Sequence, residues 1–62
     1  MRQFEKILDT KESEVRIYTL EDGRISLDFD CRNERVGIDL TISEAQKIAL
    51  ILFDAVGEVL TL

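Results

Sequence analysis

Apolar and polar residues alternate along two segments in the middle of the chain. Apolar side chains occupy every odd position of residues 25–31, and Val36, Ile38 and Leu40 alternate with Gly37, Asp39 and Thr41. A period of two is typical of strands with one face in the core and the other in water. Residues 15–20 are rich in β-branched and aromatic side chains, which also favour a strand. The pattern predicts an antiparallel β-meander over residues 15–41.

The N-terminal segment, residues 1–10, fits more than one structure. Phe4, Ile7 and Leu8 have helical spacing, whereas Phe4, Lys6 and Leu8 would share one face of a strand. We favour a strand, because the meander leaves an edge to be covered. A helix, or an arm exchanged between subunits, remains open. The polar residues 9–14 are expected to form a loop.

Two turns set the expected register. A three-residue loop at residues 21–23, with Gly23 in the left-handed conformation, is a common hairpin connection. It places Ile17 opposite Leu27 on a shared apolar face. It also pairs Val15 with Phe29 and, on the opposite face, Arg16 with Asp28.

For the second hairpin we expect a two-residue turn at residues 33–34. Cys31 then lies opposite Val36 on the core face, and Asp28 lies opposite Asp39 on the solvent face. The same register pairs Phe29 with Ile38 and Leu27 with Leu40. A slip by one residue would move the apolar set to the other face, so the pattern excludes it.

A helix is predicted over residues 43–60. Thr41 with Glu44, and Ser43 with Gln46, each form a capping-box pattern at its start. Gly57 either ends the helix or lets another backbone approach it. The predicted fold class is therefore α+β: one domain, residues 1–62, with an antiparallel meander of three to four strands and one long C-terminal helix packed on one face of the sheet.

The predicted helix has more apolar surface than one small sheet can cover. One face, suited to the sheet, contains Ala45, Ile48, Leu52, Ala55, Val56 and Val59. Further apolar positions lie beside it and predict a dimer or partner interface: Ala49, Leu50, Ile51, Phe53, Gly57 and Leu60. The N-terminal segment is one candidate cover for this excess. We favour a second copy of the chain, related by a two-fold axis.

Composition narrows the function classes. With 62 residues the chain is one small domain with a marginal core, so association would contribute to its stability. Thirteen acidic and eight basic residues give a formal charge of −5, which disfavours nucleic acid and anionic membranes as partners. No signal peptide is recognised, and the longest apolar run, residues 48–53, is too short to span a membrane. The single thiol suits the cytoplasm.

The sequence offers little for catalysis. There is no histidine, so neither a Ser-His-Asp triad nor a Cys-His pair can form. Cys31 is expected to be a small apolar side chain of the core. Asp28 and Asp39 are the one carboxylate pair considered for a cation, although Arg16 beside Asp28 favours an ordinary row of surface charges. We expect no enzyme activity, no cofactor and no metal.

A few features point to nucleic acid instead. Tyr18, Arg16 and Arg24 are expected on the solvent face of the sheet, where Tyr18 would stack on a base. The segment from Gly37 to Thr41, followed by Ser43-Glu44-Ala45 and a long helix, resembles the positive-cofactor-four family of transcriptional coactivators over residues 15–60. The resemblance implies a sheet that binds single-stranded DNA and helices that dimerise. The acidic residues Asp28, Asp30 and Asp39 on the same face depart from that function.

The leading expectation is a small acidic homodimeric interaction or regulatory module that binds a further protein and has no catalytic activity. The alternative is a single-stranded nucleic-acid-binding module that uses the sheet face.

Overall fold

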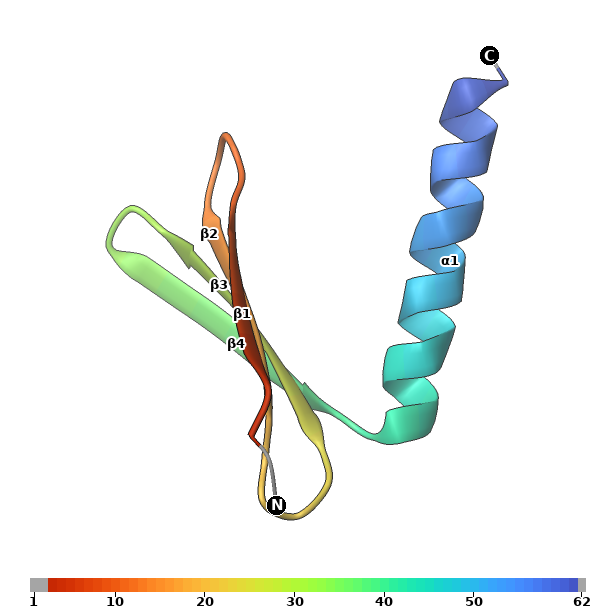
Figure 1. Ribbon diagram of the computed structural model, residues 1–62. Helices are drawn as coiled ribbons and strands as arrows, with labels where there is room; N and C mark the ends of the chain where they lie inside the picture. The colour runs from red at the N-terminus through yellow and green to blue at the C-terminus, as the bar shows by residue number, and fades with distance from the viewer. Residues whose placement is uncertain (1–2, 62) are drawn as a thin grey trace.

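The computed structural model describes residues 3–61 and contains one antiparallel sheet followed by one helix (Figure 1). The strands are β1 (Glu5–Asp9), β2 (Glu14–Thr19), β3 (Ile25–Cys31) and β4 (Glu34–Leu40). Each strand pairs with its neighbour in the sequence, in the order β1-β2-β3-β4. The predicted meander is therefore confirmed, with four strands, and β1 and β4 are its edges.

The N-terminal segment forms the edge strand β1, which was favoured because the meander left an edge to be covered. Lys6 pairs with Ile17 and Leu8 pairs with Val15, which puts Leu8 on the apolar face of the sheet. Ile7 lies on the opposite face, paired with Arg16. Because β1 is built into the sheet beside β2, it is not the cover of the helix that was considered from the sequence.

The first hairpin has the predicted register. Ile17 pairs with Leu27, and the amide of Leu20 donates to the carbonyl of Arg24 at 2.9 Å across the loop. Gly23 has a φ of 88°, a conformation that glycine adopts without steric cost. The remaining predicted pairs, Val15 with Phe29 and Arg16 with Asp28, are also present.

The second hairpin differs from the prediction by two residues. The turn is formed by Arg32 and Asn33, not by residues 33–34, and Arg32 takes a left-handed φ of 56°. Cys31 therefore lies opposite Glu34 instead of Val36. The other pairs shift accordingly: Phe29 with Val36, Leu27 with Ile38, Ile25 with Leu40, Asp28 with Gly37 and Ser26 with Asp39.

The charges on the solvent face explain the observed register. A shift of two residues keeps every apolar side chain on its face, so alternation alone cannot distinguish the two registers. The expected register set Asp28 against Asp39, and like charges in opposite positions are destabilising. The observed register instead sets Asp30 opposite Arg35, whose Nη2 lies 3.2 Å from the Asp30 carboxylate.

The helix α1 (Ile42–Leu60) begins with one of the two predicted capping boxes. The amide of Glu44 donates to Thr41 Oγ1 at 3.2 Å, and the amide of Thr41 donates to Glu44 Oε1 at 2.9 Å. These bonds satisfy two of the backbone donors that the first turn leaves without partners. Gly57 lies inside the helix, so it does not end it.

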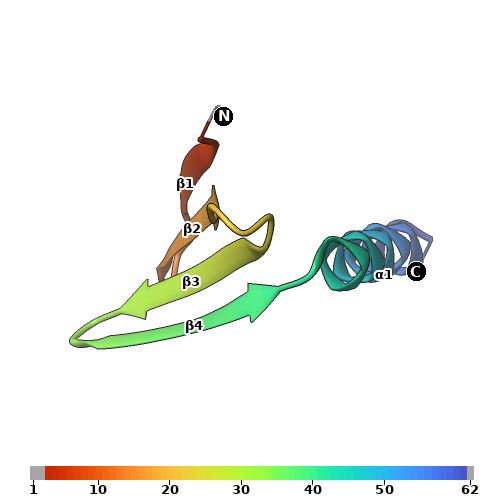
Figure 2. The ribbon, with the colours of Figure 1, turned by 90° about the horizontal axis from the view of Figure 1, so that it is seen from below.

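The predicted fold class is confirmed, but α1 has few contacts with the sheet. The helix meets the sheet mainly at β4 and then extends away from it (Figures 1 and 2). Leu40, at the end of β4, is the one apolar side chain that is buried among residues 3–61. The expectation that the helix packs along one face of its own sheet is thus met only at its first turns.

Candidate interaction surface

The apolar side of α1 consists of two neighbouring rows. The inner row starts beside the sheet: Ala45 and Ile48 are half-buried, whereas Leu52, Val56 and Val59 are exposed. The outer row contains the predicted interface residues Ala49, Leu50, Phe53, Gly57 and Leu60. Phe53 is 81% exposed and Leu60 is 79% exposed, which are extreme values for large apolar side chains. The helix therefore presents a long uncovered apolar surface.

The outer row borders an open hollow along the C-terminal half of the helix. Phe53, Val56, Gly57 and Leu60 are among the residues that line it, and its volume is about 730 Å³. A Cβ atom added at Gly57 would meet nothing within 4 Å. The single chain thus gives Gly57 no packing role, although glycine weakens the interior of a helix.

Ile51 was predicted within the same interface but lies apart from both rows. On a helical projection it falls among the polar positions Glu44, Lys47 and Glu58, and it is exposed. An isolated exposed apolar side chain is common on protein surfaces. Ile51 is therefore not brought together with the outer row.

The apolar face of the sheet is also uncovered. Phe29, on the central strand β3, is 41% exposed, and Ile38, on the edge strand β4, is 48% exposed. Ile17, Leu8 and Val36 on the same face are exposed as well. Leu40 on this face is buried where α1 begins, while its neighbour Asp39 on the opposite face is exposed, so α1 leaves the sheet on the apolar side. These two uncovered surfaces, the apolar sheet face around Ile38 and the inner row of α1, are together called the wedge.

The polar face of the sheet, in contrast, is closed by its own side chains. Ser26 is only 2% exposed, and its hydroxyl donates to Asp28 Oδ1 at 3.3 Å. The Tyr18 hydroxyl donates to Asp28 Oδ2 at 3.1 Å. A Cβ atom on Gly37, across from Asp28, would collide with that carboxylate. Glycine at this position therefore makes room for the hydrogen-bonded carboxylate.

The residues predicted to contact nucleic acid are engaged by acidic groups. Tyr18 donates to Asp28, as described. Arg24 Nε lies 2.7 Å from Asp22 Oδ2, and its Nη1 lies 3.5 Å from Asp39. The Asp22 carboxylate raises the pKa of the Arg24 guanidinium through a hydrogen bond. Arg16 Nη2 lies 3.7 Å from Glu14.

Asp22 and Arg24 are joined by both a backbone and a side-chain hydrogen bond in the first hairpin loop. The backbone amide of Arg24 donates to Asp22 Oδ1 at 3.1 Å, in addition to the side-chain bond. The hydrogen bond from the Arg24 backbone amide, and then the one from its side chain, lower the pKa of Asp22. The Arg24 charge is therefore balanced within the hairpin loop and by Asp39, and the sheet offers no basic row comparable to its carboxylates.

The expected pairing of Asp28 with Asp39 is wrong. Asp39 lies opposite Ser26, and Asp28 lies opposite Gly37. The predicted charge row from Arg16 through Asp28 to Asp39 is likewise replaced by Arg16, Asp28 and Gly37. Within residues 3–61 no group of three or more potential metal-binding side chains comes together.

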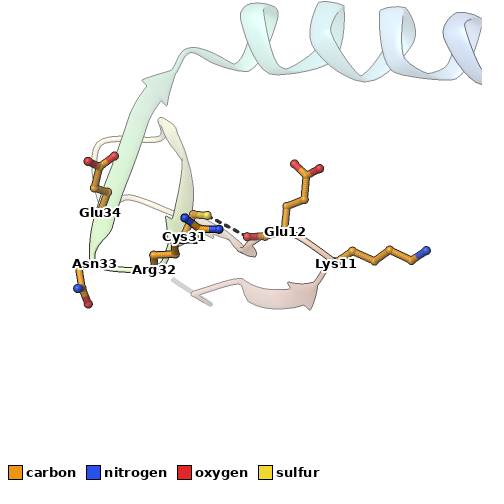
Figure 3. A pocket seen from close by; sticks show the side chains of 6 residues that line it. All are labelled: Lys11, Glu12, Cys31, Arg32, Asn33 and Glu34. Atoms are coloured by element: carbon orange, nitrogen blue, oxygen red, sulfur yellow. Dashed lines mark hydrogen bonds between the residues drawn. The ribbon is translucent and has the colours of Figure 1, made fainter.

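Cys31 was expected in the core, but this is wrong: it lies at the exposed end of β3. Its thiol donates to the carbonyl of Glu12 at 2.9 Å and so ties the β1–β2 loop to the β3–β4 turn (Figure 3). An open hollow of about 710 Å³ lies here, and Lys11, Arg32, Asn33 and Glu34 are its other lining residues. Cys31 is exposed because it ends the strand and no second layer covers the apolar face there.

The apolar residues of the sheet were not predicted to belong to an interface. Alternation correctly placed Ile17, Phe29 and Ile38 on one face, but the helix was assumed to cover that face. The missing signal lies at the junction: only Thr41 separates β4 from α1. A connection of one residue is shorter than the usual two to six residues between strands and helices.

Comparison of the chain with protein-family models, with curated proteins and with solved structures finds no match. The resemblance to positive-cofactor-four coactivators thus rests on the layout of a sheet followed by a helix. The helix in the described part of the chain is not apolar enough over a sufficient length to cross a membrane.

Proposed function

We propose that this chain is a small acidic homodimeric interaction module that acts by binding a protein partner and has no catalytic activity. The observation that carries the proposal is the uncovered apolar surface shared by the sheet and α1, including Phe53, Leu60, Phe29 and Ile38. Monomeric soluble proteins rarely expose apolar patches of more than a few hundred square ångströms, and larger patches mark interaction sites.

The arrangement of charges supports this reading. The acidic groups Asp28 and Asp30 lie on the polar face of the sheet, away from the apolar face. Association through the apolar surface would leave the polar face free. A net charge of −5 per chain would then attract a basic partner to that face in a salt-dependent manner.

The test is sedimentation equilibrium of the native chain and of Phe53→Glu. We expect a dimer for the native chain, and dissociation or unfolding for the variant, because burial of a large apolar side chain contributes about 1.5–3 kcal/mol. Ser43→Glu introduces the same charge at an exposed position of the first helical turn and is the matched control. It should leave the dimer intact. A native chain that stays monomeric at high micromolar concentration would refute the proposal.

A further protein partner needs its own test. Pull-down with the native dimer and with Asp28→Asn/Asp30→Asn, at low and high salt, measures whether the polar face binds it. The proposal expects capture of a basic protein that weakens with salt and with the double substitution. If the chain retains a labelled single-stranded oligonucleotide and captures no protein, the nucleic-acid alternative is favoured instead.

A further inference from the structure

The exposed surface of the chain is too large for a folded monomer of its mass. A monomeric protein of 7.1 kDa is expected to expose about 4,100 Å². This chain exposes 5,744 Å², which is an excess of about 1,600 Å². Removal of that excess from two chains would bury about 3,200 Å² in total, within the range of obligate homodimers. A second copy is therefore an occupant of sufficient size.

The dimensions of the chain indicate how closely the second copy must fit. Its radius of gyration is 13.3 Å, whereas a compact domain of this length has about 11 Å. A compact unit of twice the length has a radius of gyration of about 14 Å. Two such chains reach that compactness only if their centres nearly coincide. The second copy then enters the wedge of the first.

The junction at Thr41 keeps α1 from closing on its own sheet. Thr41 is extended, with φ −69° and ψ 165°, and both capping-box hydrogen bonds fix it to the first turn of the helix. Short connections that cannot reverse the chain favour exchange of the following element between copies. The wedge of each chain therefore stays open for the helix of another.

From these observations, and on the basis of the proposed homodimer, we infer that two copies exchange their helices. The α1 of each copy lies in the partner's wedge, between the partner's sheet and the partner's helix. The outer row, including Phe53 and Leu60, packs on the partner's apolar sheet face around Ile38. The inner row, including Leu52, packs on the partner's inner row.

This arrangement accounts for the width of the apolar surface of the helix. At about 100° per residue, the centres of the inner and outer rows lie roughly 110° apart. A helix on a single sheet needs one apolar stripe of a little over 100°. A helix that contacts both a sheet and another helix needs two stripes. The polar positions Lys47, Asp54 and Glu58 remain in water.

The test uses two complementary variants, Ile38→Lys on the sheet and Phe53→Glu on the helix. In an exchanged heterodimer, one helix–sheet contact is fully native, and the other sets the introduced lysine against the introduced glutamate. Both homodimers have two damaged contacts. An equimolar mixture with one isotope-labelled chain is analysed by native mass spectrometry. We expect the ratio of heterodimer to each homodimer to lie about tenfold or more above its statistical value, since about 1.4 kcal/mol gives a factor of ten.

The control mixture contains Asn33→Lys and Ser43→Glu, which make the same charge changes at exposed positions of the turn and the first helical turn. It should give the statistical proportion, with heterodimers twice as abundant as each homodimer. A statistical proportion in the test mixture as well would overturn the exchange but leave a dimer in place. A monomeric native chain would overturn the dimer itself.

A milder pair, Ile38→Ala and Phe53→Ala, covers the case in which the charged variants do not fold alone. If they do not, recovery of helical circular dichroism on mixing them supports the exchange. With the alanine pair, the heterodimer excess should be smaller but in the same direction. If neither pair prefers the heterodimer and mixing recovers no structure, each helix contacts its own sheet and the inference is wrong.

Discussion

The two faces of the sheet are built from the same strands but differ in how far a single chain covers them. On the polar face, Ser26 is buried and the Asp28 carboxylate accepts hydrogen bonds from Ser26 and Tyr18. On the apolar face, Phe29 and Ile38 remain substantially exposed. Hydrogen bonds within and between strands complete a polar surface locally, whereas an apolar face needs a second layer. Within residues 3–61 the polar face is completed by its own side chains, whereas no second layer covers the apolar face.

The largest expected effect on stability comes from placing a charge on the apolar face, compared with the same charge at a similarly exposed position of the polar face. Ile38→Asp on the apolar face should lower the free energy of unfolding by about 3 kcal/mol, because the partner buries the unpaired charge. Ile7→Asp on the polar face should change it by about 0.5 kcal/mol or less. Ile38 is 48% exposed and Ile7 is 51% exposed in the single chain, so exposure alone predicts equal effects. Urea denaturation monitored by circular dichroism measures both.

A smaller effect is expected when the closed polar face is opened. Asp28→Ala leaves the buried hydroxyl of Ser26 without its acceptor and should cost about 1–2 kcal/mol in unfolding free energy. Tyr18→Phe removes one part-buried hydrogen bond to the same carboxylate and should cost less, about 0.5–1 kcal/mol. Neither substitution should change the dimer mass in sedimentation. Dissociation by Asp28→Ala would show that the two faces are not independent.

Gly57→Ala distinguishes the single chain from the dimer. In one chain nothing lies within 4 Å of the added Cβ, so the substitution should raise helix stability by about 1 kcal/mol. In the dimer the added methyl group should meet the partner and weaken association. Compared with the native chain, Gly57→Ala should show higher helicity by circular dichroism at nanomolar concentration and a higher dissociation constant of the dimer. A gain in stability without any loss of affinity would place Gly57 outside the interface.

The smallest effect is a pH dependence at the helix start. The backbone amide and then the side chain of Thr41 lower the pKa of Glu44 below its ordinary value of 4.5. A lowered pKa in the folded state contributes stability above pH 4.5, and this contribution is lost as the pH falls through the folded pKa. Native chain should therefore lose helicity below pH 4.5 more steeply than Glu44→Gln, which keeps a neutral cap. Equal pH profiles by circular dichroism would contradict this.

The sequence predicted the parts of the fold that depend on local pattern. Alternation predicted β3 and β4, and β-branched and aromatic residues predicted β2, whereas β1 was only favoured over a helix or an arm. The loop with Gly23 and the cap at Thr41 follow from turn chemistry and capping residues. The second register was missed by two residues because both registers put Phe29 and Leu27 on the same face. Charge distinguishes the two registers: Asp28 opposite Asp39 was interpreted as a row neutralised by Arg16, and the pairing of Arg35 with Asp30 was not considered.

The candidate surface was predicted only in part for a different reason. The helical projection identified Phe53, Leu60 and the other outer-row residues, which are exposed as expected. It could not show that Phe29 and Ile38 would also be uncovered, because periodicity places residues on faces without stating what covers those faces. That information lies in the length of the connection between β4 and α1, a single residue.

The same junction makes α1 a lever. The helix has 19 residues and is about 28 Å long. A rotation of about 10° at Thr41 would displace its far end by about 5 Å, close to one helical turn of a neighbouring surface. The position of Phe53 and Leu60 is therefore set less by their own neighbours than by the backbone angles of one capped threonine. A substitution at Thr41 that keeps the strand and the helix can still redirect which surface the far end of the helix reaches.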